Sequence, residues 1–302
     1  MTLSAMLGRL LYAIAWLPGR LPLAWQRALG GALGRLALRA DLREARIARR
    51  NLELVTLEAD VGTRERRVRD ILASTGANAL ETLRIWTHDR AGNLALVQEV
   101  RGRELLDAAR AQGRGVIIAA PHYGNWELLI GYLASVAPFS LVYRVPEKGA
   151  GDVFLRLARQ GEGITLVPAE STAMRPLFRA LQRGELVGIT PDQQPKLGAG
   201  EFAPFFGRQA LTLTLIPKLA ARSGAPVVFA WAEPVPGGFD IVFEAAPADI
   251  ADADVQLAAT AMNAAVEAIA RRHPEWYQWT YKRFSKRPKG SGETNPYYPD
   301  CY

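Results

Sequence analysis

The fold is decided by residues 115–132, GVIIAAPHYGNWELLIGY, whose pattern indicates a strand, a bend and a helix. The apolar run at 115–119 predicts a buried strand. Gly124 permits a bend, because glycine adopts backbone conformations that other residues avoid, and Asn125 is a good N-cap for a helix that begins at Trp126. We therefore expect a strand whose carboxyl end leads directly into a helix.

His122 ends the expected strand, and Glu127 lies in the first turn of the expected helix. Residues five apart on one continuous helix point about 140° away from each other, so these side chains meet only if the chain bends between them. The helix dipole favours a carboxylate in the first turn, so we expect Glu127 to stay ionised and to hold the imidazole in one tautomer. The other ring nitrogen is then free to act as a general base. The alternative is a structural histidine at a strand end.

The composition sets the frame for this pair. The 302 residues are 49% hydrophobic, which is enough for one large core, and no linker rich in Ser, Gly or Pro divides them. We expect an apolar anchor and a basic helix at residues 1–50 and one catalytic domain at 51–302. The single cysteine, Cys301, excludes an internal disulfide framework and is expected to be exposed. The net charge of +7 favours acidic partners, namely anionic lipid, an acidic carrier protein or nucleic acid.

The N-terminal segment 3–25 is strongly apolar, but Arg9 and Arg20 interrupt it. It lacks the uncharged stretch of about 20 residues that a membrane-spanning helix needs. The pattern favours a membrane-associated segment in the lipid interface, or a short anchor whose arginines reach the head groups. No basic residue precedes Arg9 and no clear cleavage site follows, so we expect the segment to be retained rather than cleaved as a signal peptide.

Five arginines then recur at spacings of four, four, three and four residues, which places them along one face if the segment is a single helix. They are Arg35, Arg39, Arg43, Arg46 and Arg50. Beside an apolar anchor such a face would meet anionic lipid head groups; the alternative is a solvated face that nearby carboxylates partly balance. Nucleic acid is the weaker partner, because no recognisable nucleic-acid-binding module is present.

From residue 100 onward, segments of helical and strand pattern alternate. The expected helices span 104–112, 126–135, 153–160, 172–183, 213–223 and 253–272, and the expected strands span 115–119, 139–144, 164–167, 186–190, 226–231 and 239–243. Such alternation predicts an α/β domain in which helices flank a layered mixed sheet. Ligands in such folds bind at the carboxyl ends of the strands, where His122 is expected.

Further polar residues lie at the ends of the expected elements. Arg144 closes a strand, Arg159 ends a helix and Asp192 follows another strand, which suggests a shared rim. The apolar loop 202–207 is expected either to line a slot for a long hydrocarbon or to be a plain core loop.

Short motifs also occur in a fixed order along most of the chain. They are RNL at 50–52, HYGNWE at 122–127, DQQ at 192–194, FFG at 205–207, ALT at 210–212, GAP at 224–226 and PEWYQW at 274–279. Several motifs in order are far more specific than one histidine and carboxylate pair. On these motifs the chain resembles the bacterial late acyltransferases of lipid A biosynthesis.

The resemblance implies an enzyme of the wider lysophospholipid-type acyltransferase group, at the bacterial inner membrane with its active site on the cytoplasmic side. It implies transfer of a fatty acyl chain from acyl carrier protein thioester to a hydroxyl of a lipid A precursor, an acylated, phosphorylated glucosamine disaccharide. By that similarity His122 is the general base and Glu127 its partner. Arg159, Asp192 and, more loosely, Arg144 match substrate-binding positions. No cofactor or metal is implied.

The residues present suit direct acyl transfer. Removal of a hydroxyl proton by a positioned histidine contributes about 10²- to 10⁴-fold. Amide groups near Asn125, or Arg159, are candidates to stabilise the charge that develops on the thioester oxygen. No G-x-S-x-G motif supplies a protein nucleophile, so we expect a ternary complex without an acyl-enzyme.

Three other functions are alternatives. A metal-dependent hydrolase is disfavoured, because the chain has only His88, His122 and His273, no H-E-x-x-H motif and no paired cysteines. A non-catalytic membrane-binding protein would keep the fold and the basic face. A sister acyltransferase would act on another membrane glycolipid, an aminolipid or a lysophospholipid, although glutamate at 127 after tryptophan favours the lipid A type.

Overall fold

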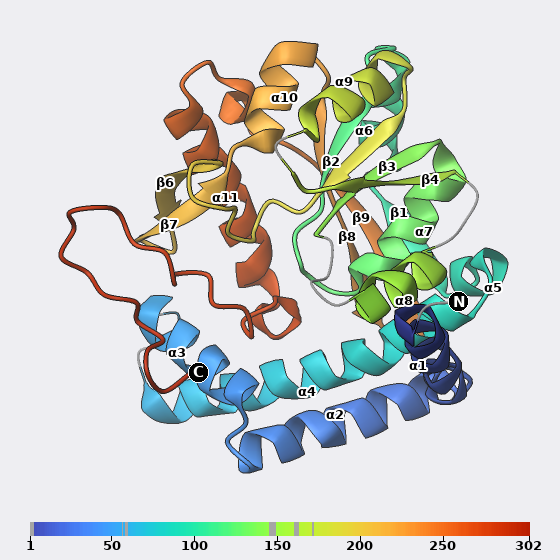
Figure 1. Cartoon of the computed structure of the whole chain (residues 1–302), viewed down its shortest axis with the longest axis vertical. Coiled ribbons are helices and arrows are strands. Elements are labelled where there is room, and N and C mark those ends of the chain that lie inside the picture. Colours follow the sequence, from blue (N-terminus) through green and yellow to red (C-terminus); the bar gives the residue numbers. More distant parts are fainter. Residues whose placement is uncertain (1–2, 56, 58–59, 145–148, 160–162, 171) are drawn as a thin grey trace.

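The computed structural model describes residues 3–55, 57, 60–144, 149–159, 163–170 and 172–302. Its centre is a seven-stranded sheet in the order β1-β9-β8-β2-β5-β3-β4. Strands β8 and β9 pair antiparallel, and the other neighbouring strands pair parallel. The sheet is therefore mixed, and helices cover both of its faces, which confirms the predicted α/β domain with a layered mixed sheet (Figure 1).

The elements follow one another in a largely alternating order. The strands are β1 (Val97–Arg101), β2 (Val116–Ala119), β3 (Phe139–Tyr143), β4 (Ile164–Pro168), β5 (Leu186–Ile189), β8 (Val227–Val235) and β9 (Gly238–Ala245), with β6 (Gly200–Phe205) and β7 (Arg208–Leu213) in a separate hairpin. The helices are α1 (Leu3–Gly19), α2 (Leu23–Arg39), α3 (Arg43–Val55), α4 (Val61–Thr87), α5 (Arg90–Leu94), α6 (Arg103–Ala111), α7 (Trp126–Val136), α8 (Gly149–Arg159), α9 (Met174–Gln182), α10 (Leu215–Ser223) and α11 (Val255–Arg272).

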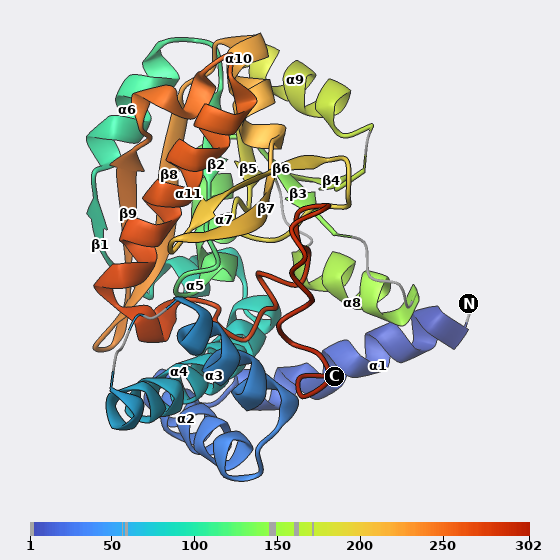
Figure 2. The ribbon, with the colours of Figure 1, turned by 90° about the vertical axis from the view of Figure 1, so that its left-hand side faces the viewer.

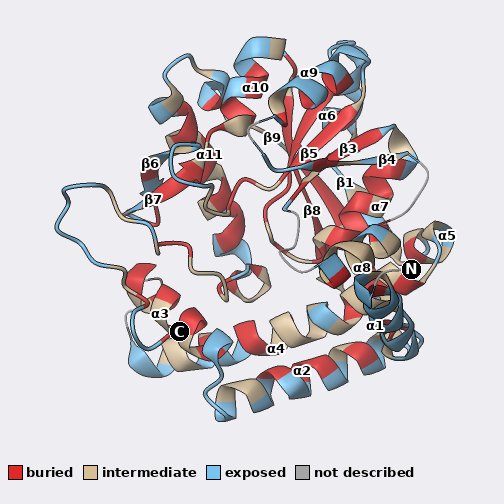
Figure 3. Cartoon of the chain, in the orientation of Figure 1, coloured by how far each residue is buried: buried red, intermediate tan, exposed pale blue. Residues whose placement is uncertain are grey.

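The central strand β2 shows why its sequence is apolar without interruption. Ile117 and Ala119 belong to the core on one face of the sheet, and Val116 and Ile118 belong to the core on the other face. Because successive side chains of a strand point to opposite faces, a strand that helices cover on both sides needs apolar residues at every position. Figure 3 shows this burial at the centre of the sheet.

Each predicted helix and strand beyond residue 100 has a counterpart in the structure. The last residue of the helix predicted at 153–160, Gln160, lies outside the described residues. Strand β8 extends to Val235 rather than ending at 231. The prediction missed β1, which lies at the edge of the sheet with a largely exposed, polar sequence, VQEVR, and therefore has no hydrophobic pattern.

The N-terminal helices form a layer beneath the sheet, where α2 lies along α4 (Figures 1 and 2). The two helices touch through glycine. A Cβ atom on Gly34 would lie 1.9 Å from the carbonyl oxygen of Leu72, and one on Gly30 would lie 2.3 Å from that of Gly76. Any side chain at these positions would push the helix axes apart, so the close packing of α2 on α4 depends on them.

Arg27 attaches α2 to the rest of the molecule. Its guanidinium pairs with the buried Glu81 of α4 at 2.5 Å, and it donates hydrogen bonds to the carbonyl oxygens of Val235 and Gly238, at 2.5 and 2.7 Å. One side chain thus ties α2 to α4 and to the turn between β8 and β9. The expected division of the chain at residue 50 falls within α3.

Within the described residues, no helix is both long enough and apolar enough to cross a membrane. Most of the exposed large hydrophobic side chains lie on α1 and α2. They are Leu3, Met6, Leu7, Leu10, Leu11, Ile14, Trp16, Leu17, Trp25, Leu29, Leu33 and Leu36.

The predicted single face of five arginines is wrong. Helix α2 ends at Arg39 and α3 begins at Arg43, so the spacing does not run along one helix. On α3, Arg43 donates to the carbonyl oxygen of Cys301 and Arg50 to that of Pro296, at 3.3 and 2.7 Å. These two arginines therefore hold the C-terminal segment, while Arg35 and Arg39 of α2 remain exposed.

One smaller expectation fails. Cys301 is 2% exposed rather than open to solvent, because the C-terminal segment folds back onto α3. The burial raises the pKa of its thiol. For residues 202–207 the structure favours the core alternative over a hydrocarbon slot. They belong to the β6–β7 hairpin, which was not predicted, and the rings of Phe205 and Phe206 are buried in the core.

The glycine contacts between α2 and α4 predict a specific pattern of stability. Gly34→Ala forces a methyl group into the Leu72 carbonyl, so we expect the free energy of unfolding to fall by about 1–3 kcal/mol. Gly31 lies on the same helix with no atom nearer than 3.4 Å to an added Cβ. Gly31→Ala should therefore leave stability unchanged or raise it by up to about 1 kcal/mol. Urea unfolding followed by circular dichroism measures both variants, and equal stabilities would contradict the packing described here.

Candidate active site

Two neighbouring strands bring the site together. Strands β2 and β5 pair in parallel, with Ala119 opposite Ile189. Both strands end at the same edge of the sheet, where β2 leads to His122 and β5 leads to Asp192. The carboxyl ends of parallel strands meet at one edge of a sheet, and this explains how residues 70 positions apart become neighbours.

Asp192 contacts His122 twice. The backbone N–H of His122 donates to Oδ2 of Asp192, and ring atom Nδ1 lies 2.8 Å from Oδ1. A carboxylate only accepts hydrogen bonds, so the proton of the neutral imidazole is assigned to Nδ1. The lone pair is therefore on Nε2, which lies 3.3 Å from the side-chain nitrogen of Gln193.

The environment keeps Asp192 ionised. Burial by itself raises the pKa of this carboxyl, but the electrostatic attraction of His122 and the two hydrogen bonds that His122 donates outweigh it, so the pKa lies below its usual value. Tyr277 is buried next to the carboxylate. Burial, together with the negative charge of Asp192, raises the pKa of the Tyr277 phenol well above 10. The anion beside the histidine is thus preserved at neutral pH.

The expected contact between Glu127 and the imidazole is wrong. Glu127 pairs instead with Arg159, the last residue of α8, with Nη2 2.6 Å and Nε 3.2 Å from its carboxylate. The chain does bend at Gly124, where φ is 63°, and Asn125 caps α7 as predicted. The bend, however, directs Glu127 toward α8 and His122 toward the end of β5.

Trp126 contacts one member of each pair. Its ring centroid lies 5.4 Å from that of His122, and the Arg159 guanidinium carbon lies 4.8 Å from the indole ring. The Arg159 and Glu127 side chains are only 7% and 3% exposed. Arg159 makes no hydrogen bond through Nη1 to any described residue. A buried guanidinium that a carboxylate holds in place, and that has a free N–H donor, is suited to bind or stabilise an anion.

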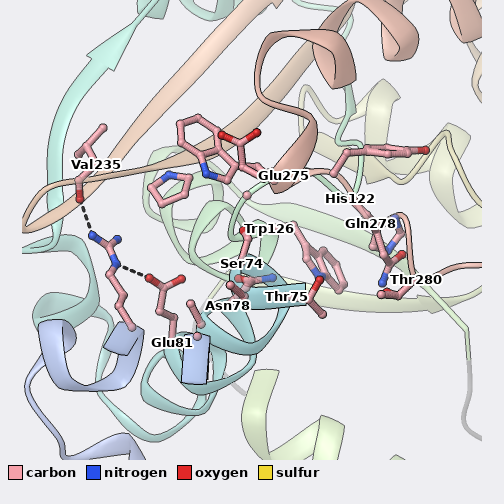
Figure 4. A pocket seen from close by; sticks show the side chains of 18 of the residues that line it. Ser74, Thr75, Asn78, Glu81, His122, Trp126, Val235, Glu275, Gln278 and Thr280 are labelled. Atoms are coloured by element: carbon pink, nitrogen blue, oxygen red, sulfur yellow. Dashed lines mark hydrogen bonds and ion pairs between the residues drawn. The ribbon is translucent and has the colours of Figure 1, made fainter. Parts of the chain in front are cut away.

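Two cavities share His122 and Trp126. The first, the α4-side cavity, has a volume of about 530 Å³ and lies between α2, α4 and residues 275–280. Figure 4 shows Ser74, Asn78 and Glu81 from α4 lining this cavity together with His122 and Gln278.

The second, the strand-end cavity, has a volume of about 640 Å³ and lies at the carboxyl ends of β3 and β5. Arg144 and Arg159 line it with His122, whereas Asp192 and Glu127 lie behind their partners and do not. The histidine is therefore accessible from two sides.

Sequence reasoning missed two residues at this border. Gln193 bonds to His122 Nε2 and, at 3.2 Å, to the side-chain oxygen of Gln278. Both residues lie in motifs that carried the family resemblance, DQQ and PEWYQW, and their polar character was the available signal. No three His, Cys, Asp or Glu side chains of the described residues are grouped closely enough to hold a metal ion.

Comparison with known proteins reveals extensive similarity. The family model described as bacterial lipid A biosynthesis acyltransferase matches residues 2–286. The lipid A biosynthesis lauroyltransferase of Escherichia coli (strain K12) is 30% identical over 281 residues, 92% of this chain and 90% of the relative. The lipid A biosynthesis palmitoleoyltransferase of the same organism is 27% identical over 280 residues, with the same coverage. A lipid A biosynthesis acyltransferase of Haemophilus influenzae is 26% identical over 274 residues, 89% of this chain and 86% of the relative.

The buried pair of Arg159 and Glu127 predicts a test of the site's construction. Arg159→Met leaves an unpaired buried carboxylate, so we expect it to lower the free energy of unfolding by about 3–5 kcal/mol. The double variant Arg159→Met/Glu127→Leu removes both charges and should recover most of that loss.

The matched control is the pair of Arg103 and Asp107, whose side chains are 40% and 51% exposed. Asp107→Asn should change the free energy of unfolding by less than about 1 kcal/mol. Urea unfolding of all three variants measures the difference. A loss for Arg159→Met no larger than that for Asp107→Asn would refute the buried pair.

Proposed function

The chain belongs to the bacterial lipid A biosynthesis acyltransferase family, and we propose that it transfers a fatty acyl chain from acyl carrier protein thioester to a hydroxyl group of a lipid A precursor. Acyl transfer in lipid A biosynthesis is the activity that the family and its named relatives share. The observation that carries the proposal is the imidazole of His122, whose Nδ1 proton Asp192 holds and whose Nε2 lies at the border of two cavities.

His122 is the general base of the proposed reaction. Nε2 takes the proton of the acceptor hydroxyl while the hydroxyl oxygen attacks the carbonyl carbon of the thioester. The carbon–sulfur bond then breaks, and the imidazolium returns the proton to the departing thiolate. The products are an ester and a free thiol. Asp192 stabilises the imidazolium through the hydrogen bond to Nδ1.

Two side chains are candidates to stabilise the negative charge on the thioester oxygen. The amide of Gln193 is the hydrogen-bond donor that contacts Nε2, so it lies beside the reacting atoms. Arg159 lines the strand-end cavity beside Trp126, with Nη1 free of other described residues. Glu127 acts in this scheme by holding Arg159 rather than by orienting His122. Preorganised donors of this kind contribute about 10²- to 10³-fold each.

Transfer proceeds directly between the bound substrates. No hydrogen bond joins His122 Nε2 to a serine, threonine or cysteine of the described residues. The side chain that contacts Nε2 is that of Gln193. Two cavities that meet at one base suit a donor and an acceptor bound at the same time. The proposal therefore includes a ternary complex and no acyl-enzyme.

The proposed place of action is the cytoplasmic side of the bacterial inner membrane. The exposed apolar side chains of α1 and α2, such as Leu10, Trp16, Trp25 and Leu29, support contact with a lipid interface. The net charge of +7 supports attraction to anionic lipid and to an acidic carrier protein.

The proposal predicts an acyl-dependent mass change. Purified full-length protein is incubated with acyl carrier proteins that carry acyl chains of several lengths and with lipid A precursors, and the products are weighed by mass spectrometry. The precursor should gain the mass of one acyl group. A precursor that gains no acyl mass with any donor would rule out the proposed substrates.

The same assay tests the residues. His122→Ala should reduce the rate by about 10²- to 10⁴-fold, because it removes the base. Asp192→Asn should have a similar effect, because it replaces one of the two oxygens that accept from His122 with an NH2 group, which only donates. The control is Arg110→Gln on α6, which replaces an exposed side chain outside both cavities. A His122→Ala variant that folds normally and retains the wild-type rate would exclude the proposed base.

A further inference from the structure

The strand-end cavity carries an unbalanced charge. Among the described residues, its lining includes Arg144, Arg159, Lys196 and Lys286 and no carboxylate. The α4-side cavity differs, because two arginines, Arg27 and Arg35, are matched there by two carboxylates, Glu81 and Glu275. Only the strand-end cavity is therefore electrostatically suited to an anion.

Three of its four strong cations have no partner among the described residues. Arg159 is neutralised by Glu127. Arg144, Lys196 and Lys286 make no hydrogen bond or ion pair through their side chains with any described residue, and all three are exposed. Like charges gathered around one cavity repel each other, and an anionic ligand would relieve that repulsion.

Gln194 holds the segments that carry the two lysines together. Its backbone N–H donates to the Tyr281 hydroxyl at 3.0 Å, and its side-chain nitrogen donates to the carbonyl oxygen of Lys282 and to Ser285 Oγ, at 2.5 and 2.9 Å. Its side-chain oxygen accepts from the backbone N–H of Lys286 at 3.0 Å. Lys196 and Lys286, 90 residues apart, are thereby fixed at one cavity. Such preorganisation lowers the entropy cost of binding a ligand.

We propose that Arg144, Lys196 and Lys286 bind a phosphomonoester of the acceptor glycolipid and so orient its hydroxyl toward His122. This inference rests on the proposed function. A phosphomonoester carries about −1.5 to −2 charges at neutral pH, which three unpaired cations match better than they match the single charge of a phosphodiester. The apolar residues Leu155, Ile189 and Leu213 of the same cavity suit the acyl chains of that lipid.

The phosphopantetheine group of the donor also contains phosphate, so the experiment separates the two sources. Dissociation constants are measured for full-length protein in zwitterionic nanodiscs with three probes. These are a bisphosphorylated acylated glucosamine disaccharide, the same lipid without phosphates, and acyl phosphopantetheine. The proteins are the wild type, Lys196→Gln/Lys286→Gln, Arg144→Gln and the control Lys218→Gln, which replaces an exposed lysine of α10 outside both cavities.

The double variant should bind the bisphosphorylated lipid about tenfold more weakly than the wild type, and Arg144→Gln should bind this lipid severalfold more weakly. The difference in affinity between each variant and the wild type should be smaller at high salt. Both variants should bind the phosphate-free lipid as tightly as the wild type does. The control Lys218→Gln should not change the affinity for either lipid. Equal binding of the phosphorylated lipid by the double variant and the wild type would overturn the proposal. So would an equal loss for both lipids, or a loss confined to acyl phosphopantetheine.

These outcomes are independent of the acyl-transfer assay. If the wild type transfers acyl chains and the variants bind the bisphosphorylated lipid as the wild type does, the proposed phosphate site is refuted and the proposed function is not. Phosphate-dependent binding without any transfer would support the site and remove the proposed function.

Discussion

The carboxylate of Asp192 joins the ends of the two strands on which the site is built. Its oxygens accept one hydrogen bond from the backbone and one from the ring of His122, so a single buried anion fixes both the main chain and the side chain. Loss of either bond would leave a buried acceptor unsatisfied, at a cost of about 1–3 kcal/mol or more for a charged group. The tautomer of His122, and its access to two cavities, both depend on this contact.

The organisation of the rest of the site is simple in outline. Trp126 contacts both His122 and Arg159, so a base and an anion-binding group lie next to one indole ring. The neutral α4-side cavity and the cationic strand-end cavity meet at that base. Different chemical surroundings on the two sides of one histidine suit an enzyme that must bind two different substrates.

Local features of the chain were predictable from the sequence, because their causes lie within a few residues. The apolar run of β2, the bend at Gly124 and the Asn125 cap all follow from residue type and spacing, and the structure has them. The carboxylate that pairs with His122 was not predictable in this way. Local spacing favoured Glu127 as the partner of His122, but the sheet brings in Asp192, 70 residues further along the chain. The break between Arg39 and Arg43 occurs at Asp41, where φ is 46° and the next N–H bonds back to the carbonyl oxygen of Ala37. Glycine usually occupies such a helix end, so aspartate gave no signal of it.

The tautomer of His122 tests the central claim most directly. Nitrogen-15 NMR of histidine-labelled protein distinguishes a protonated from an unprotonated ring nitrogen, and replacement of His88 and His273 assigns the signals. At neutral pH we predict that the proton resides on Nδ1 in the wild type and in Glu127→Gln, and that Asp192→Asn removes this preference. A proton on Nε2 in the wild type, or a tautomer that changes with Glu127→Gln and not with Asp192→Asn, would contradict the account.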